Sequence, residues 1–98
     1  MAERSWRQLR DRRMAEPGAE ESYAAARLAY ELGRSVREMR ERRGWTQAQL
    51  AGASGLTQPA VARFEAGGTV PTIPVLERLA NALEADLVVR LSPRTSAA

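Results

Sequence analysis

The pattern of polar and apolar positions in the middle of the chain predicts two short helices joined by a tight turn. Thr46 is placed to cap the first helix, and Gln49 three residues later completes a T-x-x-Q capping box. Gly55 can adopt the positive φ that a tight turn requires. Thr57 is placed to cap the second helix, in whose first turn Pro59 is tolerated. The pattern therefore predicts two capped helices that cross closely.

Helical periodicity extends to both sides of this pair. Residues 19–43 predict a long helical stretch, in which Gly33 is a candidate boundary or kink. Residues 72–84 carry apolar side chains with a 3.6-residue period, so this stripe is predicted to face the core. Residues 1–14 predict a short basic helix that ends at a Pro-Gly pair.

The pattern changes from helical to alternating near the C-terminus. Residues 86–91 alternate in a way that predicts a strand, the only strand candidate in the sequence. A lone strand leaves N–H and C=O groups unpaired, and the preferred solution is antiparallel pairing with a second copy. An edge supplied by a protein partner, or packing on the chain's own helices, stays open. The residues assigned to dimerisation are Leu87, Val88, Val89, Arg90 and Leu91.

Length and composition indicate a soluble, single-domain protein. The chain has 98 residues, of which 44% are hydrophobic and 28% charged. It contains neither an apolar run of about 20 residues, which a membrane span needs, nor a signal peptide. We therefore expect a cytoplasmic protein. The net charge of +3 is compatible with nucleic-acid binding but does not argue strongly for it.

The residue types argue against an enzyme. The chain has no cysteine and no histidine, which removes disulfides, thiolate zinc sites and the commonest general base. The carboxylates mostly stand beside arginines at helical spacing, and no convergent pair is indicated. We expect no catalytic residues, no metal and no cofactor.

The central stretch reads T-Q-A-Q-L-A-G-A-S-G-L-T-Q-P-A-V-A-R-F-E-A-G from Thr46 to Gly67. It resembles the Cro/cI (XRE) family of phage-repressor-like DNA-binding domains, and the match covers residues 32–91. The resemblance implies an all-α, five-helix domain at 32–85, with a helical extension at 1–31. Residues 86–98 would form the strand that pairs across a dimer, followed by a disordered tail. Ser54 stands where the family usually has an apolar residue.

The resemblance also implies that the second motif helix enters the major groove of DNA. The side chains expected to read bases are Thr57, Gln58, Ala60 and Arg63. Glutamine can pair with adenine, arginine with guanine, and an alanine methyl can touch a thymine methyl. The residues expected to meet phosphate are Gln47, Gly68, Thr69 and Thr72, and Gln47 is also expected to brace the recognition-helix glutamine.

The family pattern implies an ion pair between Arg40 and Glu65. This pair would tie the helix before the motif to the recognition helix. Its expected role is orientation, because a buried ion pair is weak evidence for net stability.

The flanking segments resemble HigA-type antitoxins of type II toxin–antitoxin pairs. The similarity lies in S-W-R near the start, A-E-E-S-Y-A-A-A-R-L-A-Y-E-L-G at 19–33 and A-D-L-V-V-R-L at 85–91. It implies a repressor that binds a palindromic operator as a homodimer and neutralises a RelE/HigB-like ribonuclease toxin. The candidate toxin contacts within 1–31 are Trp6, Leu9, Tyr23 and Tyr30.

The sequence leaves other interpretations open. The basic N-terminal segment could instead be a solvated helix or an arm on phosphate. The alternative function is a free-standing regulator of the same family without a toxin partner. A third interpretation is an interaction module whose helix-turn-helix no longer binds DNA.

Overall fold

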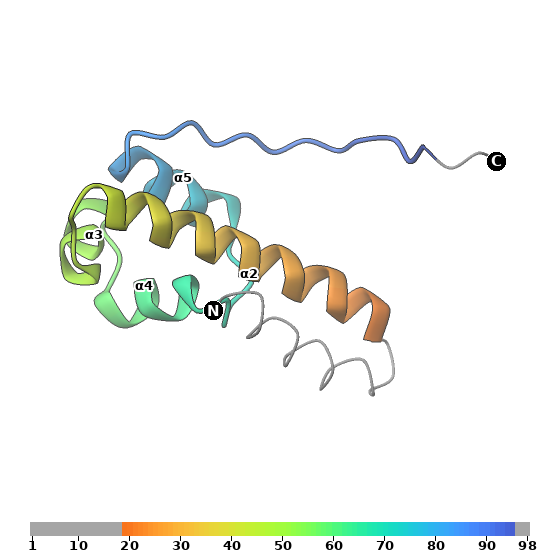
Figure 1. Cartoon of the computed structure of the whole chain (residues 1–98), viewed down its shortest axis with the longest axis horizontal. Coiled ribbons are helices and arrows are strands. Elements are labelled where there is room, and N and C mark those ends of the chain that lie inside the picture. The colour runs from red at the N-terminus through yellow and green to blue at the C-terminus, as the bar shows by residue number, and fades with distance from the viewer. Residues whose placement is uncertain (1–18, 96–98) are drawn as a thin grey trace.

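The computed structural model describes residues 19–95, which contain four helices: α2 (Ala19–Arg42), α3 (Gln47–Ser54), α4 (Gln58–Glu65) and α5 (Ile73–Ala82) (Figure 1). Helix α3 packs against both α4 and α5, and α4 packs against α2. The N-terminal half of α2 projects beyond the three short helices (Figure 1). The described residues confirm the prediction of an all-α fold.

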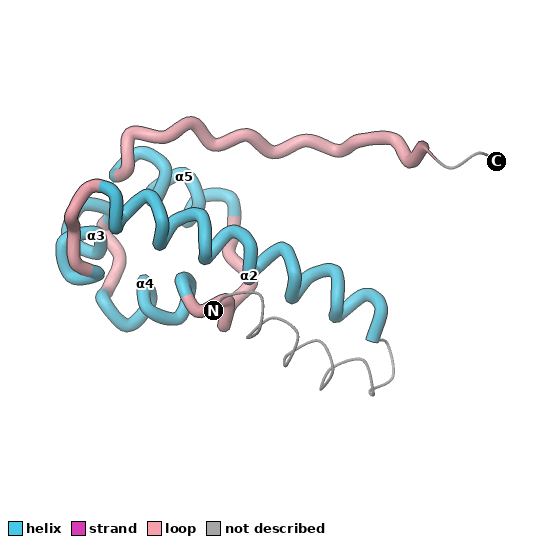
Figure 2. Tube along the Cα trace, in the orientation of Figure 1, coloured by secondary structure: helices cyan, strands magenta, loops and turns pink. Residues whose placement is uncertain are grey.

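The expectation of five helices and a C-terminal strand is wrong. Residues 19–95 hold four helices and no strand (Figure 2). Helix α2 continues through Gly33, so the candidate boundary there lies inside one unbroken helix. Residues 86–91 are extended, but within the described part of the chain no second extended segment lies beside them to exchange backbone hydrogen bonds. Because residues 86–91 do not form a strand, the predicted pairing of two such strands across a dimer is also wrong.

Each of the three short helices starts at a threonine cap. The Thr46 hydroxyl accepts from the Gln49 N–H at 3.1 Å, and the Gln49 side chain accepts from the Thr46 N–H at 2.8 Å, which confirms the capping box. Thr57 and Thr72 cap α4 and α5, each accepting from the N–H three residues on. Gly55, with φ of 75°, ends α3 and turns the chain toward α4.

The core lies where the C-terminal half of α2 meets the short helices. Leu50, Val61 and Leu79, one from each short helix, have exposed fractions of 0–1%. The other members of the cluster are Val36, Ala51, Phe64 and Leu83. Helices of eight residues are not stable alone, so this shared burial, at about 1.5–3 kcal/mol per large aliphatic side chain, holds them in place.

Ser54 is buried at the end of α3, at the position where the family usually has an apolar residue. Its hydroxyl donates to the carbonyl oxygen of Leu50 at 2.7 Å, one turn back in the same helix. The polar group is therefore satisfied within α3, and its burial leaves no unpaired donor in the core.

The chain leaves α5 through Glu84, whose φ of 54° is in the left-handed region. The segment after it runs extended, in the direction in which the N-terminal half of α2 projects beyond the short helices (Figure 2). Leu87 is half-buried, whereas Val88, Val89 and Leu91 are 77%, 62% and 98% exposed. This C-terminal segment (residues 86–95) therefore presents apolar side chains outward.

Candidate nucleic-acid interface

Helix α4 packs one face into the core and presents the opposite face outward. Val61 and Phe64 are buried with exposed fractions of 0% and 3%. Gln58 and Arg63 are exposed, and Ala60 is half-buried at the edge of the same helix. The core contacts therefore decide which side chains of α4 a groove-binding surface would carry.

The first turn of α4 offers few polar groups. The Thr57 hydroxyl accepts from the Ala60 N–H at 3.2 Å, so part of its capacity is used by the cap. Pro59 is exposed but has no N–H and no polar side chain. Gln58 is therefore the polar side chain of this turn that takes no part in the cap and can contact a ligand.

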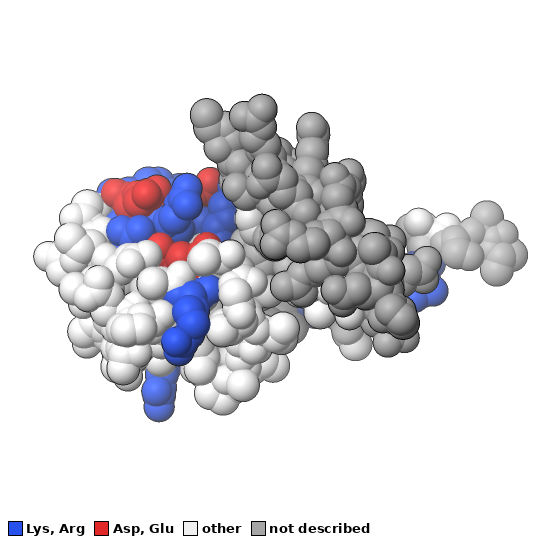
Figure 3. All heavy atoms as spheres, turned by 90° about the horizontal axis from the view of Figure 1, so that it is seen from below, with Lys and Arg blue, Asp and Glu red and all other residues white. Residues whose placement is uncertain are grey.

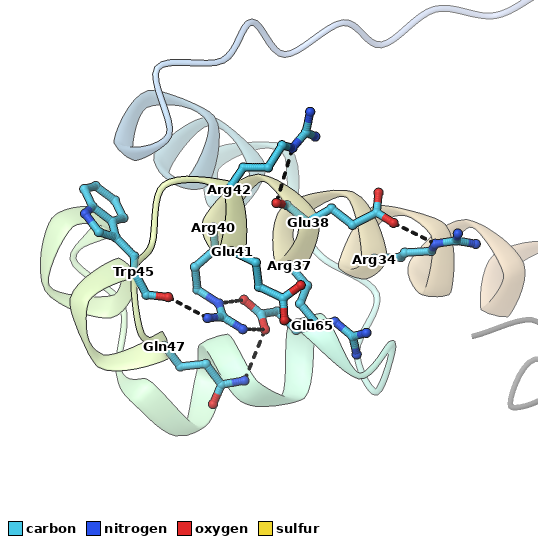
Figure 4. A network of polar contacts seen from close by, with 9 residues as sticks. All are labelled: Arg34, Arg37, Glu38, Arg40, Glu41, Arg42, Trp45, Gln47 and Glu65. Carbon is cyan, nitrogen blue, oxygen red and sulfur yellow. Dashed lines mark hydrogen bonds and ion pairs between the residues drawn. The ribbon is translucent and has the colours of Figure 1, made fainter. Parts of the chain in front are cut away.

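Glu65, the last residue of α4, attaches this helix to α2. Its side chain is 2% exposed and forms a bidentate ion pair with Arg40 of α2, with Nε–Oε2 and Nη2–Oε1 distances of 2.7 and 3.0 Å (Figure 4). Arg40 also donates through Nη1 to the carbonyl oxygen of Trp45 at 2.7 Å. One guanidinium thus holds α4 and the loop before α3 against α2, which is the pairing that the family pattern implied.

Electrostatics reinforce this contact. The hydrogen bond to Glu65, together with the charges of Glu65 and Glu41, raises the pKa of Arg40 above its ordinary value, although burial acts in the opposite direction. The guanidinium is therefore charged at every working pH, and its positive charge compensates the charge of the Glu65 side chain buried beside it.

Gln47, the first residue of α3, joins the same network. Its Nε2 donates to Glu65 Oε1 at 3.1 Å (Figure 4). The sequence resemblance led us to expect a brace to the recognition-helix glutamine near the start of α4. The hydrogen bond that the structure contains is instead to Glu65 at the end of that helix.

The remaining phosphate candidates lie in the loop between α4 and α5. Gly68 and Thr69 are exposed, and the Gly68 N–H donates to the Arg63 carbonyl at 2.9 Å. The Thr72 hydroxyl accepts from the Val75 N–H at 3.3 Å as the cap of α5.

Gly33 is a positioning residue that the sequence did not reveal as such. It is buried where the end of α4 meets α2, and a Cβ placed on it would overlap the Phe64 carbonyl oxygen and lie 2.9 Å from that of Glu65. Gly67, with φ of 77°, lies after α4 and packs against Tyr30 of α2. The sequence shows only that a single glycine interrupts a helical pattern at position 33. The requirement for glycine there comes from contact with Phe64 and Glu65, which are more than 30 positions away.

Arg43 is a second residue that the sequence did not single out. Its Nη2 donates to Glu84 at 2.9 Å and its Nη1 to the Leu83 carbonyl at 3.3 Å. The guanidinium carbon also lies 4.5 Å from the centre of the Trp45 ring. Arg43 therefore joins the end of α2 to the end of α5. Its hydrogen-bond partners lie 40 and 41 positions away along the chain, so no local pattern could indicate these contacts.

The other predicted residues are distributed away from this network. Tyr23 and Tyr30 are half-buried on α2, and neither is without an interaction partner. Trp6 and Leu9 lie outside the described residues. The predicted dimerisation residues lie in the C-terminal segment, on the other side of the molecule from α4 (Figure 1).

The face that carries α4 is mostly uncharged in its visible part. Basic side chains stand out on it, and acidic groups gather beside basic ones along one edge (Figure 3). Residues 19–95 hold no group of three or more side chains suited to bind a metal ion. Over the same residues, no helix is long and apolar enough to cross a membrane.

Comparison with known proteins identifies the family. The family model described as a helix-turn-helix domain matches residues 31–92, which include α3, the Gly55 turn and α4. The chain belongs to the helix-turn-helix domain family. This helix-turn-helix protein is 30% identical over 70 residues to the HTH-type transcriptional regulator SutR of Escherichia coli (strain K12), covering 71% of the chain and 39% of that relative.

A second relative matches a shorter part of the chain. The Competence pilus inhibition repressor of Acinetobacter baylyi is 40% identical over 52 residues, which is 53% of the chain and 47% of that protein. The helix-turn-helix protein thus spans less than half the length of both relatives. No solved structure gives a significant match.

Proposed function

We propose that this protein is a transcriptional regulator that binds duplex DNA with α4 as its recognition helix. The observation that carries the proposal is the orientation of α4. Its inner face is buried in the core, its end is tied to α2 by Glu65, and its outer face is exposed. A rigidly held helix with an exposed outer face is what insertion into a major groove requires.

The proposed base contacts follow from the exposed side chains of α4. Gln58 in the first turn suits adenine, and Arg63 one turn later suits guanine. Ala60 supplies a methyl contact, and the partly engaged Thr57 hydroxyl supplies a weaker polar one. Each bidentate contact contributes about 1–3 kcal/mol of discrimination between bases.

The proposed phosphate contacts flank this helix. The start of α3 offers backbone N–H groups and the second N–H of the Gln47 amide, whose first N–H is donated to Glu65, and anions are favoured at helix N-termini. Gly68, Thr69 and Thr72 supply further groups from the loop after α4. Such contacts fix the register of the protein on DNA but carry no sequence information themselves.

The proposal is tested by titrating the protein with duplexes from its own promoter over a range of salt concentrations. Wild-type protein should bind, with affinity falling steeply as salt rises. Arg63→Ala should lose about 1–3 kcal/mol of preference at one base step, because the bidentate contact is gone. Competition assays with single-base variants of the site measure this loss.

Arg94→Ala is the matched control, because Arg94 carries the same charge in the C-terminal segment, away from α4. Its preference among the single-base variants should equal that of wild type. A uniform loss of affinity for all duplexes in Arg63→Ala would make Arg63 a phosphate contact. Indifference of the wild-type protein to DNA in dilute buffer would end the proposal.

We further propose that the regulator acts as a homodimer on a palindromic operator. The support is the row of exposed apolar side chains Val88, Val89 and Leu91, together with Leu87 and Arg90, in the C-terminal segment. Exposed apolar side chains gathered in one segment mark interaction surfaces. A symmetric dimer would place half-sites about 10 base pairs, or a multiple of that, apart.

Replacing both Val88 and Leu91 with aspartate should shift the protein from dimer to monomer and weaken operator binding. The reason is that two charges would have to be buried against apolar side chains of the second copy. Sedimentation equilibrium measures the change in mass. Leu28→Asp, at a residue 61% exposed on α2, is the control that should stay dimeric. A doubly substituted protein that remains a dimer refutes this interface.

Antitoxin activity is the second candidate function. It is supported by the likeness of the flanking segments to HigA-type antitoxins and by α2, whose N-terminal half projects past the core with Leu28 exposed. On this proposal residues 1–31, with Trp6, Leu9, Tyr23 and Tyr30 as anchors, contact a RelE/HigB-like ribonuclease. An adjacent reading frame for a small basic protein that binds this chain separates this candidate from a free-standing regulator.

A further inference from the structure

Helices α3 and α4 are linked at two places, by the turn between them and by a hydrogen bond between their far ends. The turn at Gly55 connects the end of α3 to the start of α4. Gln47 is the first residue of α3 and Glu65 the last of α4, so the Gln47–Glu65 hydrogen bond of 3.1 Å joins the two ends that lie away from the turn. The covalent turn and the shared core hold the two helices together near the turn, and this side-chain contact adds a polar link between their far ends.

The chemistry of the contact fixes how the Gln47 amide lies. A carboxylate offers only acceptor atoms, so the amide nitrogen must face Glu65. The amide oxygen then points away from the network, as Figure 4 shows. Because Arg40 already neutralises the Glu65 charge through two hydrogen bonds, a neutral donor completes the site without adding a net charge.

The contact also has consequences for DNA binding. The start of α3 is where phosphate contact is proposed, and α4 carries the proposed base contacts. Both sets can be satisfied together only if the angle between the helices is correct. The loss of a phosphate contact alone would weaken binding to all duplexes equally, whereas an error in this angle would weaken the contacts that read sequence most.

We propose that Gln47 is a positioning residue of the recognition helix, which sets the angle between α3 and α4 through Glu65 and so controls discrimination between DNA sequences. This inference rests on the proposed function. A positioning role predicts a change in the ratio of the affinity for promoter DNA to the affinity for unrelated DNA. A phosphate-contact role predicts no change in this ratio.

The test compares Gln47→Met with Gln49→Met. Methionine keeps side-chain length and helix propensity but cannot donate to Glu65. Gln49 lies on the same helix and bonds to the Thr46 N–H instead, so its replacement weakens α3 without touching Glu65. For each protein, the affinities for the promoter duplex and for an unrelated duplex of equal length are measured below the melting transition. Gln47→Leu provides a second apolar replacement if the methionine variant folds poorly.

The expected result is that Gln47→Met and Gln47→Leu lower the ratio of promoter to unrelated affinity by about tenfold, the size of one hydrogen bond to a charged group. Gln49→Met should lower the melting temperature but keep the ratio. Equal losses on both duplexes, or an unchanged ratio, in the Gln47 variants overturn the inference alone. Wild-type protein that does not distinguish the duplexes overturns the proposed function, and the inference with it.

Discussion

Replacing Arg40 with methionine is expected to lower the free energy of unfolding by about 3–5 kcal/mol, because it leaves a buried carboxylate without its partner. The Glu65 side chain is 2% exposed, and two of the three hydrogen bonds it accepts come from Arg40. The Gln47 amide alone cannot neutralise the charge. Thermal or urea unfolding measures the loss, and binding to promoter DNA should weaken in parallel.

Arg37→Met is the matched control on the same helix. Arg37 pairs with Glu41 at 3.9 Å, and both side chains are more than half exposed. Water screens such a pair, so its loss should cost about 0–0.5 kcal/mol. If Arg40→Met were as stable as Arg37→Met and bound DNA as well, the ion pair would have no structural role.

The double replacement of Arg40 and Glu65 by methionine separates stability from orientation. Buried ion pairs can often be exchanged for apolar side chains without loss of stability. The doubly substituted protein should therefore recover most of the unfolding free energy while its DNA affinity stays low. Recovery of both would show that the pair serves stability and not the placement of α4.

The second large effect is expected from Gly33→Ala. In an ordinary helix interior this change stabilises by about 0.5–1 kcal/mol, because alanine has the higher helix propensity. Here the new methyl would overlap the Phe64 carbonyl oxygen, which is backbone and cannot move without moving α4. Overpacking costs about 1–3 kcal/mol in well-packed sites, and a clash with rigid backbone belongs at the upper end. We expect a net loss of about 2 kcal/mol, or roughly 8–16 °C in melting temperature.

Gly52→Ala is the control with the opposite sign. Gly52 is exposed within α3, and a Cβ there would have no atom within 4 Å. This variant should melt about 2–8 °C higher than wild type, since only helix propensity changes. A Gly33→Ala protein that is also stabilised would mean that α4 does not approach α2 as closely as the structure indicates.

Local chemistry explains the parts of the fold that could be predicted. The Thr46–Gln49 capping box and the left-handed Gly55 depend on neighbours within a few residues, so their pattern is visible in the sequence. The buried stripe of α5 likewise repeats with the period of its own helix. Three threonine caps and one glycine were enough to locate the short helices.

Contacts between distant residues explain what could not be predicted. The alternation at residues 86–91 predicted a strand, and that prediction is wrong: the segment runs extended, but a strand also needs a neighbour, and pairing is not a property of the segment itself. Gly33 suggested a break because a helical glycine is costly, whereas the structure keeps the helix and uses the missing side chain for the approach of α4. The Arg40–Glu65 pair came from the family pattern, and Gln47 was assigned a different partner.

The sequence by itself determined the helix-turn-helix, because capping, turn geometry and amphipathic periodicity are written in residues close along the chain. Only the tertiary structure decided how α4 is held, through one carboxylate that receives Arg40 from α2 and Gln47 from α3. It also decided that Gly33 belongs inside a helix. The physical reason is that desolvation and steric exclusion act between atoms that meet in space, whatever their separation along the chain.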